Sequence, residues 1–193
     1  MTICFGLGRD GMEKAMERPN IFTYEQEEAI VELLETLNDD TQLYFGCDSV
    51  AFRKSGKWYA RFATVLIVHM NGNKGCKIFR NISDEQVYDT MKGKPADRLM
   101  KEVYKIVDLY LQLSPLLDGY DMHIHLDINP NPKHGSSCVA TQAAGYVLGM
   151  TGIEPVMKPQ TPDDPIAWAS SFGADGVGRG FDKRAVSYSK NVH

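Results

Sequence analysis

Residues 121–130, which read DMHIHLDINP, have the pattern of a β-strand that ends in a functional site. Because side chains alternate between the two faces of a strand, one face is apolar and the other carries His123, His125, Asp127 and Asn129. Two prolines then stop the strand. The pattern permits two chemistries. All three side chains of His-x-His-x-Asp could bind a metal, or Asp127 alone could contribute to a Mg²⁺ site.

The composition of the 193-residue chain is that of one globular domain, with 43% hydrophobic and 24% charged residues. Its longest apolar run is too short to cross a membrane, and residues 1–14 lack the pattern of a signal peptide. The four cysteines lie far apart, which favours reduced thiols in a cytoplasmic protein over a structural zinc site. No membrane partner is expected.

The charge is unevenly distributed along the chain. Residues 1–40 hold ten acids and three bases, whereas residues 41–193 hold fifteen acids and eighteen bases. Residues 48–94 are the most basic part, with nine bases against four acids. This mild basicity permits contacts with phosphate but does not by itself identify a nucleic-acid partner.

The first 22 residues are predicted to be an N-terminal extension, and residues 23–193 a single domain. Residues 6–11 read GLGRDG and match the dinucleotide fingerprint, but the flanking segments are too short for the strand and helix that it requires. Thr23 and Gln26 form a capping box that opens an amphipathic helix. The outward face of this helix is acidic, so we expect it on the periphery of the domain.

Residues 43–82 predict three antiparallel strands. An apolar run over 43–49 is followed by a turn at 54–57, a long strand over 58–70, a second turn and a strand over 76–82. The first strand carries Asp48 near the end of an otherwise apolar run. Because an isolated buried charge is costly, Asp48 is expected to be paired or functional.

The second half of the chain predicts helices alternating with strands. A helix over 95–113 places Glu102 beside its buried stripe, unlike its other two acids. Ser136 or Ser137 is predicted to cap a helix that reaches Met150, with Gly152 as its C-cap. A short strand over 154–158 and a helix over 164–175 follow, and the tail is expected to be irregular. The fold class is therefore α/β, a mixed sheet covered by helices.

Four short stretches in this order carry a family resemblance. They are residues 46–49 (GCDS), 98–102 (RLMKE), 124–129 (IHLDIN), and 158–159 (KP) with 167–175 (AWASSFGAD). Over residues 40–185 the chain resembles the ribonuclease H-like superfamily and, within it, the YkuK-type nuclease family. The resemblance implies a five-stranded mixed sheet, a β-meander followed by alternating helices and strands, with helices on both faces. Its first and fourth strands would be adjacent.

The resemblance also implies a site and a function. Asp48, Glu102, Asp127 and Asp175 would hold two divalent ions, Mg²⁺ or Mn²⁺, for phosphodiester hydrolysis of RNA, DNA or a hybrid. Asp163 or Asp164 could replace Asp175. Ser49 and Asn129 are candidates for hydrogen bonds around the ligands or to substrate. Lys133 and His134 are candidates for phosphate contacts.

Two other functions compete with the nuclease. A zinc hydrolase would use His123, His125 and Asp127, because imidazole and carboxylate together favour zinc. Zinc hydrolases with this motif, however, carry it on a loop followed at once by a further histidine, and here Ile128 follows. A non-catalytic nucleic-acid-binding protein on the same fold is the other alternative.

Overall fold

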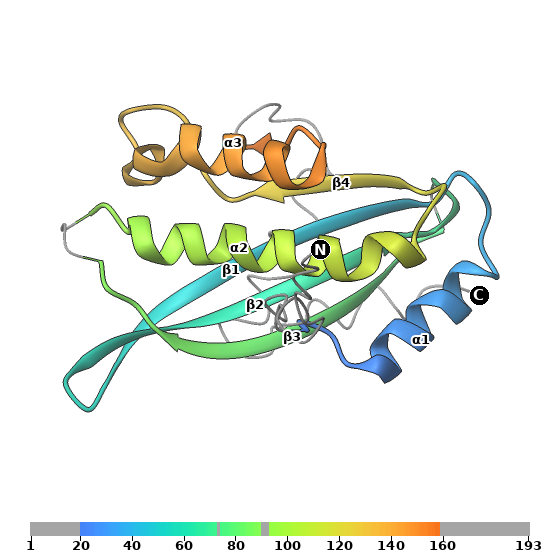
Figure 1. The fold of residues 1–193 in the computed structure, drawn as a ribbon, viewed down its shortest axis with the longest axis horizontal. Helices are drawn as coiled ribbons and strands as arrows, with labels where there is room; N and C mark the ends of the chain where they lie inside the picture. Colours follow the sequence, from blue (N-terminus) through green and yellow to red (C-terminus); the bar gives the residue numbers. More distant parts are fainter. Residues whose placement is uncertain (1–19, 73, 90–92, 159–193) are drawn as a thin grey trace, which may run out of the picture.

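The computed structural model describes residues 20–72, 74–89 and 93–158. The elements follow in the order α1 (Tyr24–Leu34), β1 (Gln42–Lys54), β2 (Lys57–His69), β3 (Cys76–Gln86), α2 (Ala96–Leu113), β4 (Asp121–Leu126), α3 (Ala140–Thr151) and β5 (Val156–Met157). The strands form one sheet in the order β3-β2-β1-β4-β5. Figure 1 shows α2 lying across the long β1–β2–β3 meander, with α3 along β4. The five-stranded mixed sheet with its helices confirms the predicted α/β fold class. Helices were expected on both faces, whereas those among the described residues all pack against one face.

The β1–β2 hairpin is closed by a two-residue turn. Both Ser55 (φ 50°) and Gly56 (φ 79°) have positive φ. This is the geometry of a type I′ turn, whose twist matches that of the two strands it connects. Pairing then runs unbroken from Lys54 opposite Lys57 to Gln42 opposite His69. The turn predicted over residues 54–57 is confirmed.

The third strand is longer than its apolar pattern predicted. Residues 83–86 continue β3 past the expected end at Ile82 by pairing with residues 59–62 of β2. Polar side chains are common on an edge strand because one side of it faces solvent. Their polarity therefore does not end the strand.

The larger hydrophobic core lies between one face of the sheet and the three described helices. Phe45 and Phe62 from the sheet meet a stripe of α2 that includes Val103 and Ile106. α1 and α3 contribute further residues to this same cluster, namely Ile30, Leu34, Ala143 and Val147. The other face of the sheet has a smaller buried cluster, made of Tyr44, Ala63, Val65 and Ile67.

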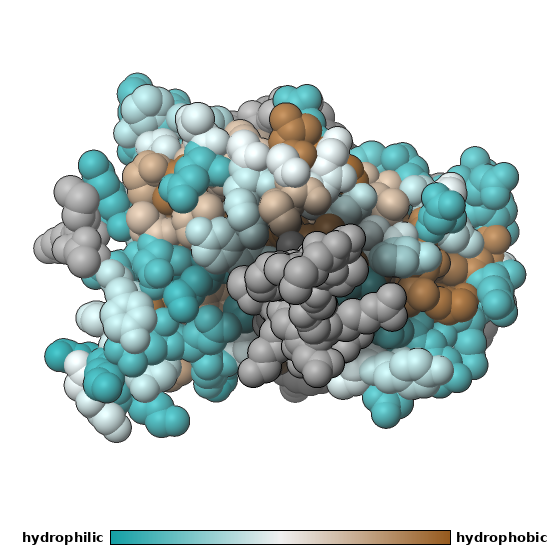
Figure 2. Space-filling model, in the orientation of Figure 1, coloured by the Kyte–Doolittle hydropathy of each residue, from teal (hydrophilic) through white to brown (hydrophobic). Residues whose placement is uncertain are grey.

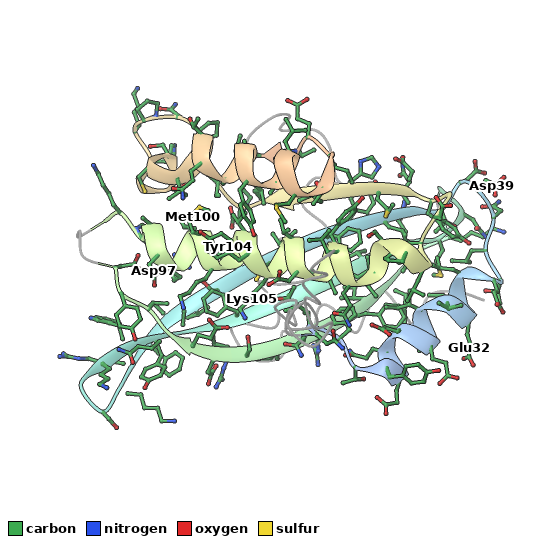
Figure 3. All side chains as sticks on the ribbon, viewed as in Figure 1. Glu32, Asp39, Asp97, Met100, Tyr104 and Lys105 are labelled. Atoms are coloured by element: carbon green, nitrogen blue, oxygen red, sulfur yellow. The ribbon has the colours of Figure 1, made fainter. Side chains whose placement is uncertain are left out.

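The N-terminal helix begins as its sequence predicts. The hydroxyl of Thr23 accepts a hydrogen bond from the Gln26 backbone, and the Gln26 side chain accepts one from the Thr23 backbone. Its acids line the exposed side, and Figure 3 shows Glu32 pointing outward. Just before α1, Ile21 and Phe22 are buried, and both backbone N–H groups donate to Gln112 of α2. The core of the domain therefore includes the last two residues of the segment expected as an extension.

The start of α3 differs from its prediction. The helix begins at Ala140 after a short 3-10 helix, Gly135–Val139, and its N-cap, Val139, makes no side-chain cap. The two serines bind the preceding loop instead. Ser136 Oγ accepts from the Asn129 N–H, and Ser137 Oγ donates to the His134 carbonyl. The predicted C-cap is confirmed, because Gly152 adopts the left-handed conformation with φ 74°.

None of the described helices is long and apolar enough to cross a membrane. The helix expected over residues 164–175 and the irregular tail lie outside the described residues, as do residues 1–19.

Candidate functional site

The register of β1 and β4 directs Asp48 and Asp127 to adjacent positions. β1 and β4 are parallel neighbours, and their register pairs Gln42 with Asp121 and Phe45 with Ile124. Continued along both strands, this register brings Asp48 opposite Asp127, the first residue after β4. Both aspartates are half-buried. Neighbouring strands are about 4.8 Å apart, and this is the backbone separation that the register implies for the two residues.

The side chain of Asp48 faces away from α2. Cys47, on one side of Asp48, belongs to the larger core, and Ser49, on the other side, bonds to α2. The pairing of β1 with β2 passes through Asp48 and Ala63 without a bulge. Because side chains alternate along a strand, Asp48 projects from the face that also carries Tyr44 and Ala63.

Glu102 approaches the same place from the α2 side. Its side chain is buried, as its position beside the apolar stripe predicted. Ser49 Oγ donates to Glu102 Oε1 at 2.5 Å, and Arg98 Nη1 lies 3.1 Å from the same oxygen. Arg98 also donates to the hydroxyl and the carbonyl of Ser49, at 2.7 and 2.8 Å. Ser49, Arg98 and Glu102 are therefore hydrogen-bonded to one another on the α2 side of β1, next to Asp48.

The pKa of Glu102 is raised to about 8. Burial is the main cause, because it disfavours the charged carboxylate. Arg98 and the hydrogen bond from Ser49 lower the pKa, and the charges of Asp48 and Asp127 raise it. Glu102 is therefore within electrostatic reach of both strand carboxylates, and it is mainly protonated at neutral pH.

Asp127 has a cationic partner on the next segment of the chain. Lys158, which directly follows β5, places Nζ 2.8 Å from Asp127 Oδ1. Each of the two side chains is 30% exposed, so the ion pair is partly screened by water. β5 pairs with β4 through His125 opposite Val156 and Leu126 opposite Met157, and this pairing brings Lys158 next to Asp127.

The two histidines of the His-x-His-x-Asp stretch both contact the Tyr44 ring. The His123 ring stacks on Tyr44 with centroids 4.9 Å apart, and His125 meets it edge-on at 5.1 Å. His123 Nε2 is 2.9 Å from Asp121 Oδ2. The histidines share a face with Asp127, as predicted. Aromatic packing and Asp121, however, account for the orientation of His123.

The loop after Asp127 is ordered by short-range hydrogen bonds. Asn129 Oδ1 accepts from the Asn131 N–H, and Asn131 Oδ1 accepts from the Lys133 N–H. Lys133 and His134 are both exposed. At the end of the loop, a Cβ on Gly135 would lie 2.0 Å from the Gly93 carbonyl oxygen. Only glycine fits at 135, because the segment that leads into α2 passes directly beside it.

A family model described as Ribonuclease H-like matches residues 26–175. The chain belongs to the ribonuclease H-like family. Searches among curated proteins and solved structures found no match. Family membership confirms the superfamily that the four short sequence stretches indicated. Asp48 lies on β1, and Asp127 directly follows the adjacent strand β4.

Of the four acids expected in a ribonuclease H-like site, Asp48 and Asp127 are at adjacent positions of β1 and the end of β4, and Glu102 lies on the α2 side within electrostatic reach of both. Asp175, together with Asp163 and Asp164, lies outside the described residues. Two cationic partners were not predicted, namely Arg98 and Lys158. The spacing of Arg98 and Glu102 one helical turn apart could have indicated the first pair. No local pattern links Lys158 to Asp127, because the contact depends on sheet pairing.

The donor atoms available here are carboxylate oxygens, which Mg²⁺ and Mn²⁺ prefer. Within residues 20–72, 74–89 and 93–158, no group of three or more His, Cys, Asp and Glu side chains is arranged to hold a metal ion. Lys158 and Arg98 supply the positive charge next to Asp127 and Glu102. The donor type therefore fits a divalent ion, and the ion would compete with these two side chains.

Proposed function

We propose that this protein is a divalent-metal-dependent nuclease that hydrolyses phosphodiester bonds in nucleic acid. The observation that carries the proposal is the adjacency of Asp48 and Asp127, with Glu102 within electrostatic reach of both from the α2 side. Membership of the ribonuclease H-like family supports the same activity. The free thiols of Cys47, Cys76 and Cys138 fit the cytoplasmic location that we propose with it.

Asp48, Glu102 and Asp127, joined by Asp175, are the residues that would hold two Mg²⁺ or Mn²⁺ ions. Two such ions activate a water molecule and stabilise the leaving oxygen when they are bound. Asp48 projects from the face opposite α2, and strand alternation continued from β4 would direct Asp127 to the same face. Glu102 lies on the α2 side and is mainly protonated, so a part in holding an ion would require the loss of its proton.

The neighbouring side chains would have supporting roles. Ser49 is buried against Glu102 and Arg98, so we assign it to positioning Glu102 rather than to direct contact with substrate. Asn129 orders the loop after β4. Lys133 and His134 are exposed on that loop, where they would contact a phosphate of the substrate.

A second candidate function is nucleic-acid binding without cleavage. Lys158 already pairs with Asp127, and Glu102 is mainly protonated beside Arg98, so both carboxyl groups are accommodated without an added ion. In that case the chain would retain the fold and bind nucleic acid through its basic surface.

Cleavage assays on the full-length protein separate these functions. Labelled single strands, duplexes and hybrids are incubated with Mg²⁺, Mn²⁺, Zn²⁺ or EDTA. We expect cleavage with Mg²⁺ or Mn²⁺ that is lost in Asp48→Asn and Asp127→Asn. Asp39→Asn makes the same chemical change in the exposed loop after α1, labelled in Figure 3, and should retain activity.

Each alternative has its own result. Binding without cleavage under every metal condition would support the non-catalytic protein. Cleavage that requires Zn²⁺ and is lost in His125→Ala, but persists in Asp48→Asn, would overturn the proposed two-metal nuclease.

A further inference from the structure

The β1–β2 hairpin extends beyond the helices at one end of the molecule. Figure 1 shows its turn projecting at the lower left, past the start of α2. In Figure 2 this end of the surface is largely hydrophilic. The same two strands lead back to Asp48 without a break in their pairing. The hairpin is therefore a continuous strip that connects an exposed tip with the candidate site.

One face of this strip carries a regular series of cross-strand pairs. Starting from Asp48 opposite Ala63 and moving toward the turn, the pairs on the Asp48 face are Val50–Arg61, Phe52–Tyr59 and Lys54–Lys57. We call these six residues the hairpin track. Lys54 is six positions after Asp48 on β1, so at about 3.3 Å per residue it lies about 20 Å from Asp48 along the strand.

The outer end of the track concentrates positive charge. Lys54 and Lys57 are exposed and directly opposite each other. Two like charges in that position are unfavourable in an isolated hairpin, and a bound anion would relieve the repulsion. Arg61 adds a third cation and is paired with Asp84 of β3 at 2.8 Å. Asp84 is the acid that pairs with the track, and the charge of Lys54 also lowers its pKa.

The middle of the track is aromatic. The rings of Phe52 and Tyr59 stack with centroids 5.9 Å apart, and the Arg61 guanidinium lies 5.8 Å from the Phe52 centroid. Aromatic rings beside cations are typical of surfaces that bind single-stranded nucleic acid. Bases stack on the rings, while the cations contact phosphates.

We propose that the hairpin track binds a single-stranded segment of the nucleic-acid substrate and directs it toward Asp48. The proposal rests on the proposed nuclease function for the direction of the strand, but the binding itself does not require catalysis. Lys54 and Lys57 hold phosphates at the outer end. A base stacks on the Phe52–Tyr59 pair, which lies between the two lysines and Asp48.

The test is fluorescence anisotropy with a labelled single-stranded oligonucleotide and the full-length protein in EDTA, repeated at several salt concentrations. Lys54→Ala/Lys57→Ala is expected to weaken binding. It should also lower the slope of log K against log salt by about 1.4, because each phosphate contact on a single strand contributes about 0.7. Tyr59→Leu should weaken binding by about tenfold through lost stacking.

A matched control removes two lysines from the other end of the meander. Lys74 and Lys77 are exposed around the β2–β3 turn, and Lys74→Ala/Lys77→Ala makes the same change in net charge. This variant should keep the salt slope of the unchanged protein. Melting curves for both double variants should show intact folding, because all four lysines are exposed.

The outcomes separate this inference from the proposed function. If the protein cleaves nucleic acid but the hairpin variant binds with unchanged affinity and salt slope, single-strand binding by the hairpin track is refuted and the nuclease function is retained. If the protein binds through the track but never cleaves, the nuclease function is refuted and binding by the track is retained. Preferential binding of duplex, with a slope change near 1.8, would overturn the single-stranded occupant.

Discussion

Lys158 Nζ lies 2.8 Å from Asp127 Oδ1, so the carboxylate that directly follows β4 is already paired with a cation of its own chain. β5 contains only two residues, Val156 and Met157, yet its pairing with β4 fixes where Lys158 emerges. If a divalent ion binds to Asp127, it competes with this ammonium group. The ion pair therefore sets part of the cost of metal binding.

Removing this competitor should strengthen metal binding. We expect Lys158→Ala to bind Mn²⁺ up to about fivefold more tightly, the equivalent of about 1 kcal/mol for a partly exposed ion pair. Isothermal titration calorimetry of the full-length protein with Mn²⁺ measures this affinity. Lys101→Ala breaks a comparable pair with Glu85 and should leave the affinity unchanged. An equal or lower affinity in Lys158→Ala would contradict the competition.

Glu102 should make the metal-free protein less stable as pH rises. Its pKa is about 8 in the folded state, against an ordinary value of 4.5. The folded protein thus binds the extra proton between these values, and its stabilising effect is complete below pH 4.5 and lost as pH rises through 8. The free energy of unfolding should fall by up to about 1.4 kcal/mol per pH unit in this window.

Urea denaturation between pH 5.5 and 8.5, with EDTA present, tests this dependence. Glu102→Gln keeps the shape and should flatten the profile. Glu85→Gln is the control, because the pKa of Glu85 is lowered by Lys105 and Lys101 despite its partial burial. The stabilising contribution of the Glu85 carboxylate is lost only at acidic pH. Glu85→Gln should therefore not change how the free energy of unfolding depends on pH above 5.5. A steep profile that persists in Glu102→Gln would assign the effect to another group.

Ser49→Ala should make the proton on Glu102 harder to remove. The hydroxyl donates to Glu102 Oε1 at 2.5 Å and so stabilises the charged carboxylate. Its loss should shift the pH window upward and cost about 1–3 kcal/mol of stability, since the buried partners lose a hydrogen bond. Thr64→Val removes a hydroxyl that contacts Cys47 on the same sheet face and serves as the control. An unshifted window would show that Ser49 does not govern Glu102.

Gly135→Ala should loosen the contact between the loop after β4 and the segment before α2. The new methyl group would lie 2.0 Å from the Gly93 carbonyl oxygen, so the backbone must move. We expect a loss of about 1–3 kcal/mol and faster hydrogen exchange around residues 93–94 and 127–135. Gly149→Ala, in α3 with open space around it, should instead be neutral or stabilising. Equal stability of the two variants would refute the close approach.

Local patterns predicted the elements that depend on local chemistry. The turn at Ser55 and Gly56, the capping box at Thr23 and the inward position of Glu102 each follow from neighbouring residues, and each is confirmed. The adjacency of Asp48 and Asp127 came from the family resemblance, because strand order is a long-range property.

Features that depend on competition between partners were not predictable. Ser136 and Ser137 have the side chains of helix caps, yet the preceding loop uses their hydroxyl groups. Ser49 was expected around the ligands, but its bond to Arg98 depends on how α2 packs against β1. The pairing of Lys158 with Asp127 likewise requires β5 to be in register.

The alternation of β1 also determines where the chain tolerates a change in length. Asp48 and Ser49 are consecutive, and their side chains project from opposite faces of the sheet. Deleting one residue from β1 before Asp48 would turn the aspartate toward Glu102 and the serine toward Asp127, exchanging a charged group and a neutral one. An insertion at the Ser55–Gly56 turn leaves that order intact. We therefore expect length variation among natural variants of this protein at the hairpin tip and not within residues 42–49.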